Sequence, residues 1–193
     1  MMNSINYIRK TITILGTNLR KNLNLSDFRR WSRRSSLSSK WDVRTEKIGR
    51  LVPCESTVIE FGAGRIVLPQ YLPEGCKYTP SDICDRGHGT IVCDLNQKEL
   101  PSSIKRYDVA VFSGVLEYVS DVPRLIKKLS PMVDCIVASY AVKEYTPIKS
   151  TRRVNGWVND YSQKLVVRIF ETEGYICDHI ELWNRQCIFR FIK

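Results

Sequence analysis

The sequence predicts an α/β domain whose mostly parallel sheet carries helices on both faces and ends in an antiparallel β-hairpin. Short apolar runs rich in β-branched residues recur across residues 57–140, and each ends in a polar or glycine-containing turn. Helix-like segments or loops separate these runs, as in sheets whose neighbouring strands are parallel. The last two strand-like segments flank Trp183-Asn184-Arg185, which is typical of a hairpin at a sheet edge.

Length and charge divide the chain into two parts. The 193 residues suffice for one domain with a full hydrophobic core and an appendage. Residues 1–40 hold nine Lys or Arg and one acid, so eight of the ten net positive charges lie there. A serine-rich stretch closes this segment. We therefore expect a basic N-terminal arm with a linker at 1–40 and a folded domain at 41–193.

The arm has three interpretations. Its apolar residues recur at helical intervals and so predict an amphipathic helix: Ile5, Ile8, Ile12 and Leu15. Such a helix could contact the anionic inner surface of a membrane. The arm could instead bind nucleic acid, although few aromatic residues stand among its charges, or it could be a solvated tail. The solvated tail and a binding role stay open alternatives; as a binding partner, an anionic membrane surface is favoured over nucleic acid.

Other features indicate the compartment. No apolar run approaches the ~18 to 20 residues of a membrane span, and the N-terminus lacks the features of a signal peptide. The seven cysteines contain no C-x-x-C pair and are interpreted as reduced thiols. The spacing of Cys84, His88 and Cys93 matches no common zinc pattern, so no metal site is expected. These features predict a cytoplasmic protein.

The turn after the first predicted strand organises the candidate site. Apolar β-forming residues lead into Glu60, and Gly62 and Gly64 follow. Glycine permits a tight turn and lets a ligand approach the main chain closely. Residues 66–72 then read as an apolar helix-like segment. Because Ile66 stands where a further glycine would be sought, these residues alone suit an ordinary turn as well as a nucleotide-type cofactor loop.

Acidic residues end the next two predicted strands. Asp82 closes a strand at 77–82 and lies 22 positions after Glu60. An acid about 20 residues beyond the glycine turn, at the end of a neighbouring strand, is placed to bind a ribose diol. Asp94 closes a third strand at 90–94. Only seven residues, 83–89, separate this third strand from the second, which is too few for a helical crossover.

The remaining elements complete the alternating pattern. A short helix at 41–53 is expected to turn Val43, Ile48, Leu51 and Val52 toward the core. The clearest strand begins at Tyr107 and runs into Ser113 and Gly114. Later segments are a helix capped by Asp121, a strand at 134–140, a polar connection at 145–161, a helix capped by Ser162 and the hairpin.

In this order the motifs resemble class I S-adenosylmethionine-dependent methyltransferases of the small-molecule, type 11-like kind. The resemblance covers residues 57–193 and rests on Ile59-Glu60-Phe61-Gly62-Ala63-Gly64, Ser81-Asp82, Cys93-Asp94-Leu95-Asn96 and the segment 107–119. The last segment is the most specific, with Tyr118 where many members carry histidine. The resemblance implies a Rossmann-like fold and S-adenosyl-L-methionine as cofactor.

The resemblance also implies roles for particular residues. Gly62 and Gly64 would lie beside the methionine part of the cofactor with Glu60 at its amino end, Asp82 would bind the ribose, Asp94 and Leu95 the adenine, and Ser113 and Gly114 would border the sulfonium. On the acceptor side, Glu117 and Tyr118 are the candidate catalytic residues.

The expected function is methyl transfer from this cofactor to a small-molecule, glycan or lipid-linked acceptor, at a hydroxyl group. One alternative is an RNA-binding or RNA-modifying protein that uses the basic arm. No N/D-P-P-Y/F motif follows the fourth predicted strand, which disfavours base methylation. Another alternative is a non-catalytic partner subunit that keeps the fold.

Overall fold

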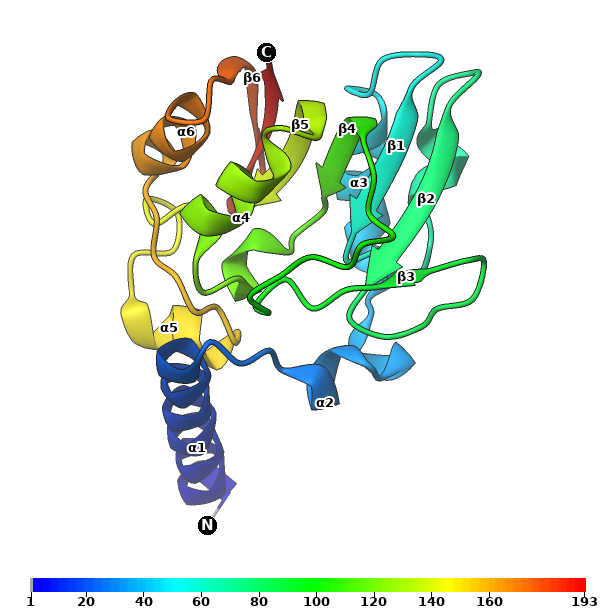
Figure 1. The fold of residues 1–193 in the computed structure, drawn as a ribbon. Coiled ribbons are helices and arrows are strands. Elements are labelled where there is room, and N and C mark those ends of the chain that lie inside the picture. The colour runs from blue at the N-terminus through cyan, green and yellow to red at the C-terminus, as the bar shows by residue number, and fades with distance from the viewer. Residues whose placement is uncertain (1) are drawn as a thin grey trace.

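The computed structural model describes residues 2–193, with side chains from residue 6 onward. Within this part of the chain, seven strands form one sheet in the order β3-β2-β1-β4-β5-β7-β6 (Figure 1). Neighbours from β3 to β5 are parallel, whereas β7 is antiparallel to both β5 and β6. The strands are β1 (Thr57–Phe61), β2 (Lys77–Asp82), β3 (Ile91–Val92), β4 (Tyr107–Phe112), β5 (Val133–Tyr140), β6 (Ile176–Trp183) and β7 (Gln186–Ile192).

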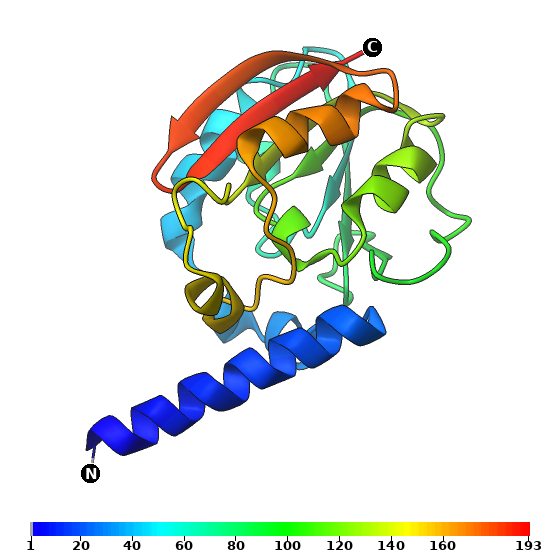
Figure 2. The same cartoon turned by 90° about the vertical axis from the view of Figure 1, so that its left-hand side faces the viewer.

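Helices cover both faces of the sheet (Figures 1 and 2). Helices α4 and α6 join one apolar cluster that includes Ile126 and Phe170, and α3 joins a second that includes Ile48. The α-helices are α1 (Met2–Leu23), α2 (Phe28–Trp31), α3 (Asp42–Gly49), α4 (Val122–Leu129), α5 (Lys149–Val154) and α6 (Gln163–Glu171). Short 3-10 turns lie at Arg34–Ser36, Ser39–Trp41, Leu68–Tyr71 and Leu116–Tyr118. The predicted fold class, a Rossmann-like sheet with an antiparallel hairpin, is confirmed.

The expected caps account for two of these helices. The Asp121 side chain accepts a hydrogen bond from Arg124 N at 3.0 Å and begins α4. The Ser162 hydroxyl accepts one from Leu165 N at 3.1 Å and begins α6. Each cap satisfies a backbone donor that the first helical turn leaves unpaired.

Three local expectations were wrong. The segment 66–72 forms only the 3-10 turn at Leu68–Tyr71, because Ile66 has a positive φ of 55° and Leu72, which precedes Pro73, is extended with a ψ of 143°. In α3, Val43 is exposed, and the neighbouring Arg44 and Thr45 are buried instead. The connection at 145–161 contains α5, whose two arginines are buried against Asp160.

The N-terminal arm has two structural parts. Helix α1, expected from its apolar spacing, packs on α5 and extends beyond the body of the domain (Figure 2). Residues 24–41 then cross the lower end of the sheet in Figure 1, passing through α2 before α3 begins. No helix among the described residues combines the length and apolar character needed to cross a bilayer.

Candidate functional site

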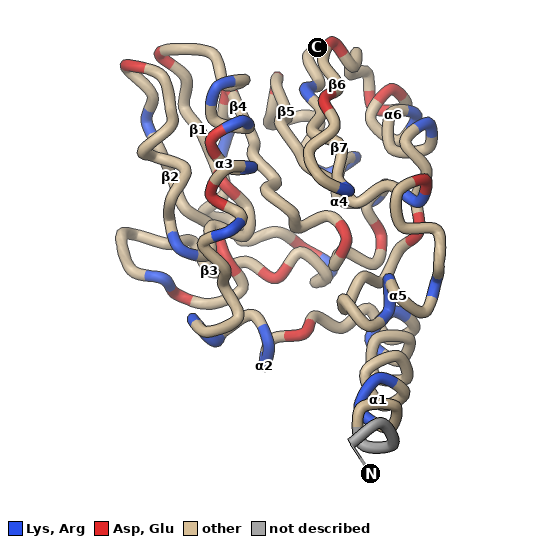
Figure 3. Tube along the Cα trace, turned by 180° about the vertical axis from the view of Figure 1, so that it is seen from behind, with Lys and Arg blue, Asp and Glu red and all other residues tan. Residues whose placement is uncertain are grey.

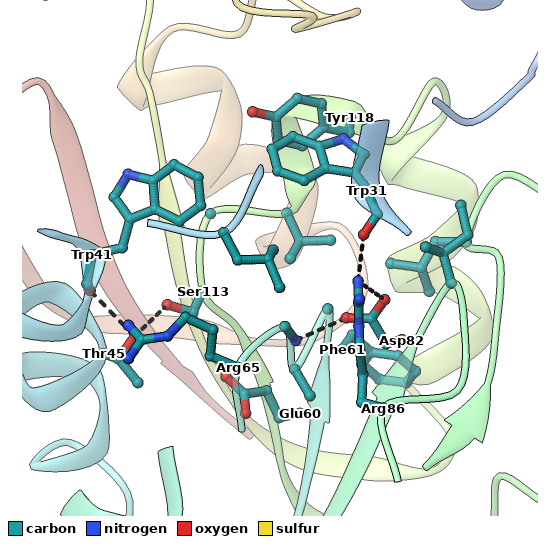
Figure 4. A pocket seen from close by; sticks show the side chains of 18 of the residues that line it. Trp31, Trp41, Thr45, Glu60, Phe61, Arg65, Asp82, Arg86, Ser113 and Tyr118 are labelled. Carbon is teal, nitrogen blue, oxygen red and sulfur yellow. Dashed lines mark hydrogen bonds and ion pairs between the residues drawn. The ribbon is translucent and has the colours of Figure 1, made fainter. Parts of the chain in front are cut away.

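A cavity of about 220 Å³ lies at the carboxyl ends of β1, β2 and β4 (Figure 4). From β1 the strands run outward through β2 and β3 on one side and through β4 and β5 on the other. This reversal between β1 and β4 is the point where open α/β sheets bind their ligands, because no crossover covers it. The cavity therefore lies where the sequence placed the candidate site.

The glycine turn forms one wall of the cavity. Gly62 has a φ of 74°, and the N–H groups of Gly62 and Ala63 both donate to the carbonyl oxygen of Ser81, at 2.8 and 3.0 Å. A Cβ atom on Gly62 would lie 2.4 Å from Val115 Cγ2, so a side chain does not fit there. Ile66 adopts a φ of 55° without being glycine, which costs backbone strain. The turn keeps its tight shape without the third glycine.

Asp82 lies at the centre of a polar network. One carboxylate oxygen accepts from Gly64 N at 2.8 Å, and the other accepts from Arg86 Nη2 at 3.0 Å. Arg86 also donates to the carbonyl oxygens of Trp31 and Ser32 (Figure 4). Both charged side chains are almost fully buried, at 4% and 5% exposed. This ion pair links the end of β2 to the N-terminal arm.

Asp94 and Leu95 line the cavity just beyond β3. The Asp94 carboxylate accepts a hydrogen bond from Ser26 Oγ at 2.5 Å and from Asn96 N at 3.0 Å. Asn96 Nδ2 in turn donates to Ser26 Oγ at 2.7 Å. The arm therefore contacts this predicted residue too.

Glu60 is buried where β1 ends. Its side chain accepts a hydrogen bond from Tyr78 Oη at 2.6 Å, and only 3% of the residue is exposed. Burial raises the pKa of the Glu60 carboxyl to about 8, since a charge there loses its hydration. At neutral pH the group is mostly protonated, and a cation entering the cavity would favour its ionisation.

Arg44 was not among the residues predicted from the sequence. Its guanidinium donates from Nε to Ser113 Oγ at 3.2 Å and from Nη2 to the Ser113 carbonyl at 2.9 Å. It packs so closely on Gly114 that an added Cβ would lie 2.3 Å from Arg44 Nη1. Burial lowers the pKa of Arg44. The sequence did contain an indication of this placement, because Arg44 lies four positions before the inward-facing Ile48 and so shares its face of the helix.

The second half of the arm forms another wall, which the sequence did not predict. Trp31, Leu37 and Trp41 line the cavity together with Ser26 and Asp27. The Trp31 ring lies edge-on to the Tyr118 ring with centroids 4.7 Å apart (Figure 4). The boundary at residue 40 stays a prediction, but residues 26–41 belong to the wall of this cavity.

Two residues that line the cavity each contain a buried donor with no hydrogen-bond partner among the described residues. The donors are Trp31 Nε1 and Arg86 Nε. An unpaired buried donor costs about 1–3 kcal/mol.

The sequence of this chain matches a known family. Residues 24–138 fit the family model described as a methyltransferase domain. The chain belongs to this family. It is a class I S-adenosylmethionine-dependent methyltransferase, and the resemblance inferred from its motifs is confirmed. No curated protein matches its sequence.

Solved structures share the fold of this methyltransferase. A chain from a Haloferax volcanii complex that contains the Trm112 methyltransferase activator has a TM-score of 0.69 at 11% identity, covering 86% of this chain and 97% of its own. An S-adenosylmethionine-dependent methyltransferase from Mesorhizobium loti has a TM-score of 0.63 at 14% identity, covering 79% of this chain and 100% of its own. The Burkholderia thailandensis 1,6-didemethyltoxoflavin-N1-methyltransferase was solved with bound 1,6-didemethyltoxoflavin and S-adenosylhomocysteine. It has a TM-score of 0.58 at 11% identity, covering 79% of this chain and 78% of its own. At such identities the likeness shows the fold alone.

Of the two candidate catalytic residues of the methyltransferase, only Tyr118 lines the cavity. The Tyr118 hydroxyl accepts a hydrogen bond from Trp157 Nε1 at 3.2 Å. Burial raises the pKa of Tyr118 to about 12, so its hydroxyl is neutral at physiological pH. Glu117 is fully buried behind the wall and accepts from Ala141 N at 2.8 Å and Gln186 Nε2 at 3.0 Å. Burial raises the pKa of Glu117 as well.

A second hollow adjoins the first and shares Trp41, Arg44, Trp157 and Gln186 with it. Its other lining residues are Lys40, Trp183, Asn184 and Arg185. The two hollows together are lined by all four tryptophans of the chain. In the described part of the chain, no group of three or more His, Cys, Asp or Glu side chains could hold a metal ion.

Proposed function

We propose that this methyltransferase binds S-adenosyl-L-methionine in the 220 Å³ cavity and transfers its methyl group to a hydroxyl of a small-molecule, glycan or lipid-linked acceptor. The observation that carries the proposal is that a tight glycine turn, the buried carboxylate of Asp82 and the buried guanidinium of Arg44 meet around one cavity at the switch point of the sheet. These groups suit a ligand with a ribose, a heteroaromatic base and a charged amino-acid part.

Each predicted residue has a role in this proposal. Asp82 accepts hydrogen bonds from the ribose hydroxyls, and Asp94 with Leu95 contacts the adenine ring. Glu60 pairs with the ammonium group, and its proton leaves as the cation binds. The remaining contacts come from the two turns that border the cavity, Gly62 with Gly64 and Ser113 with Gly114.

Arg44 adds a group that the predicted set lacked. The amino-acid part of the cofactor carries a carboxylate besides its ammonium, and the predicted residues include no cation to match it. Arg44 lines the cavity beside Ser113 and is 6% exposed. A buried guanidinium binds a carboxylate strongly because both hydrogen bonds are charge-assisted. We therefore assign Arg44 to the cofactor carboxylate.

The acceptor enters from the hollow lined by Trp157 and Trp183. The bound cofactor supplies an electrophilic methyl group, and the protein aligns the acceptor hydroxyl with it. Tyr118 stays neutral and so orients the acceptor by hydrogen bonding instead of acting as a strong base. Glu117 does not line the cavity; it is a positioning residue that acts through Gln186, which also binds Arg44 at 2.9 Å.

The proposal also includes that the protein is cytoplasmic and that residues 1–40 attach it to the inner surface of the membrane. It would bring the cavity to acceptors that are assembled on lipids. A protein that uses the arm to bind or modify RNA is the alternative, and a partner subunit without catalytic activity is another.

Methyl transfer from radiolabelled cofactor to fractionated lipids, glycans and RNA of the native cell separates these functions. Label in the lipid or glycan fraction supports the proposal. Label in RNA favours the alternative. Binding of cofactor without transfer to any fraction would identify a non-catalytic relative.

A further inference from the structure

Helix α1 carries an exposed apolar stripe along its length. Side chains three or four positions apart lie on one face of a helix. On α1 such spacing joins five large apolar residues, each more than half exposed: Ile8 (55%), Ile12 (63%), Leu15 (63%), Leu19 (58%) and Leu23 (56%). A contiguous exposed apolar surface of this kind marks an interaction site, because it is costly to leave in water.

The opposite face of α1 is seated on the domain. Thr17 is fully buried and donates through Oγ1 to the Arg153 carbonyl at 2.9 Å. Arg153 Nε donates in turn to Asn18 Oδ1 at 3.1 Å. Because Thr17 contacts α5, the stripe, which lies on the opposite side of the helix, faces away from α5. The stripe is therefore available to a partner without any rearrangement of the domain.

The charge of α1 indicates which partner fits. The helix contains Arg9, Lys10, Arg20 and Lys21 and no acidic residue, although Arg20 pairs with Asp27 at 3.1 Å; the tube view shows blue segments and no red ones along it (Figure 3). Within α1 the exposed cations are Arg9 and Lys10, and the segment after the helix adds exposed Arg29, Arg33 and Arg34. A second copy docked through the same stripe would bring like charges together. An anionic surface is complementary to them.

Position in the fold agrees with a flat, extended partner. Helices α1 and α2 lie at the end of the molecule to which the parallel strands point, and this end is the lower edge in all three overall views (Figures 1, 2 and 3). The cavity opens at the same carboxyl ends of the strands. A surface that contacted the stripe would therefore lie at the cavity end of the molecule, next to the segment 26–41 that covers the site.

We propose that α1 docks in the interfacial layer of an anionic membrane, with the stripe from Ile8 to Leu23 inserted among the acyl chains. The basic residues of the arm contact the lipid headgroups. Amphipathic helices with cationic polar residues bind such interfaces through apolar burial and charge together. The inference deepens the membrane attachment of the proposed function by assigning it to α1 and the basic residues that follow, and its test does not depend on methyl transfer.

Sedimentation with lipid vesicles tests the proposal. The full chain is expected to bind vesicles of equal parts phosphatidylcholine and phosphatidylglycerol and to leave them as salt rises. The double variant Leu15→Glu/Leu19→Glu should bind about a hundredfold more weakly, because two buried leucine side chains are lost from the interface. The matched control is Ile176→Glu/Leu182→Glu, which makes the same charge change at residues 66% and 50% exposed on the distant hairpin.

Several outcomes would overturn the proposal. Equal vesicle binding by the stripe variant and the control would show that charge alone determines binding and that the stripe is not inserted in the membrane. Failure of the unaltered chain to bind these vesicles at low salt would exclude membrane docking. Light scattering that shows a dimer, converted to a monomer by Leu15→Glu/Leu19→Glu, would assign the stripe to a second copy. Circular dichroism of each variant confirms that it is folded, since the changed side chains lie outside the core.

Discussion

Replacing Asp82 by asparagine is expected to weaken cofactor binding sharply. In the proposed complex its carboxylate accepts charge-assisted hydrogen bonds from two ribose hydroxyls, each contributing ~1.5–3 kcal/mol. Asparagine keeps one neutral acceptor, so we expect a net loss of about 2–3 kcal/mol, or about a 30- to 150-fold rise in the dissociation constant.

The same change also affects the stability of the fold. Asp82 pairs with Arg86 at 3.0 Å, and the two side chains are 5% and 4% exposed. Loss of the carboxylate leaves a buried guanidinium without its partner, which costs about 3–5 kcal/mol of the free energy of unfolding. A fall in affinity could then reflect unfolding instead of a lost contact.

A matched variant separates these causes. Asp160 pairs with two arginines that are 1% exposed, Arg152 and Arg153, and it does not line the cavity. Asp160→Asn should therefore lower the melting temperature as Asp82→Asn does, yet bind S-adenosyl-L-methionine normally at temperatures where both remain folded. Calorimetric titration measures the affinities, and thermal circular dichroism measures the stability. Equal affinity in the folded Asp82→Asn variant and the unaltered chain would refute the assigned role.

Three further predictions concern the same cavity. Gly62→Val should abolish cofactor binding in titrations because its side chain would meet Val115, whereas Gly174→Val, also at a positive φ but with no atom within 4 Å, should bind normally. Arg44→Met should weaken S-adenosyl-L-methionine about tenfold and leave its decarboxylated analogue unaffected; equal losses for both ligands would contradict the assigned salt bridge. Glu60 has a pKa of about 8 folded and 4.5 unfolded, so cofactor affinity should rise, and the free energy of unfolding should fall, as pH increases between these values. Glu60→Gln should remove both slopes, and denaturant titrations across that pH range that keep them would exclude Glu60 as their source.

Elements with strong local signals were predictable from the sequence. The run from Tyr107 to Phe112 became β4, and the capping residues Asp121 and Ser162 begin α4 and α6 as expected. Elements that depend on tertiary contacts were not. Helix α5 contains Arg152, which is 1% exposed and binds Asp160 and the Ala141 carbonyl oxygen, contacts that form only in the folded chain. No local pattern in a polar segment indicates them.

The candidate site shows the same division. The glycine turn and Asp82 lie in consecutive strand ends, so spacing along the chain was enough to place them together. Arg44 and Trp31 reach the cavity from segments that precede the first strand, and only the folded chain brings them to it. Composition described the arm as basic, but it gave no sign that residues 26–41 would cover the site.

Calorimetric titration of the full chain with S-adenosyl-L-methionine tests the central claim most directly. Tryptophan fluorescence can follow the same titration, because Trp31 and Trp41 line the cavity. We predict saturable binding of one cofactor per chain, with competition by S-adenosylhomocysteine and a change in tryptophan emission. A folded chain that gives neither saturable heat nor a change in emission would contradict the assignment of this cavity as a cofactor site.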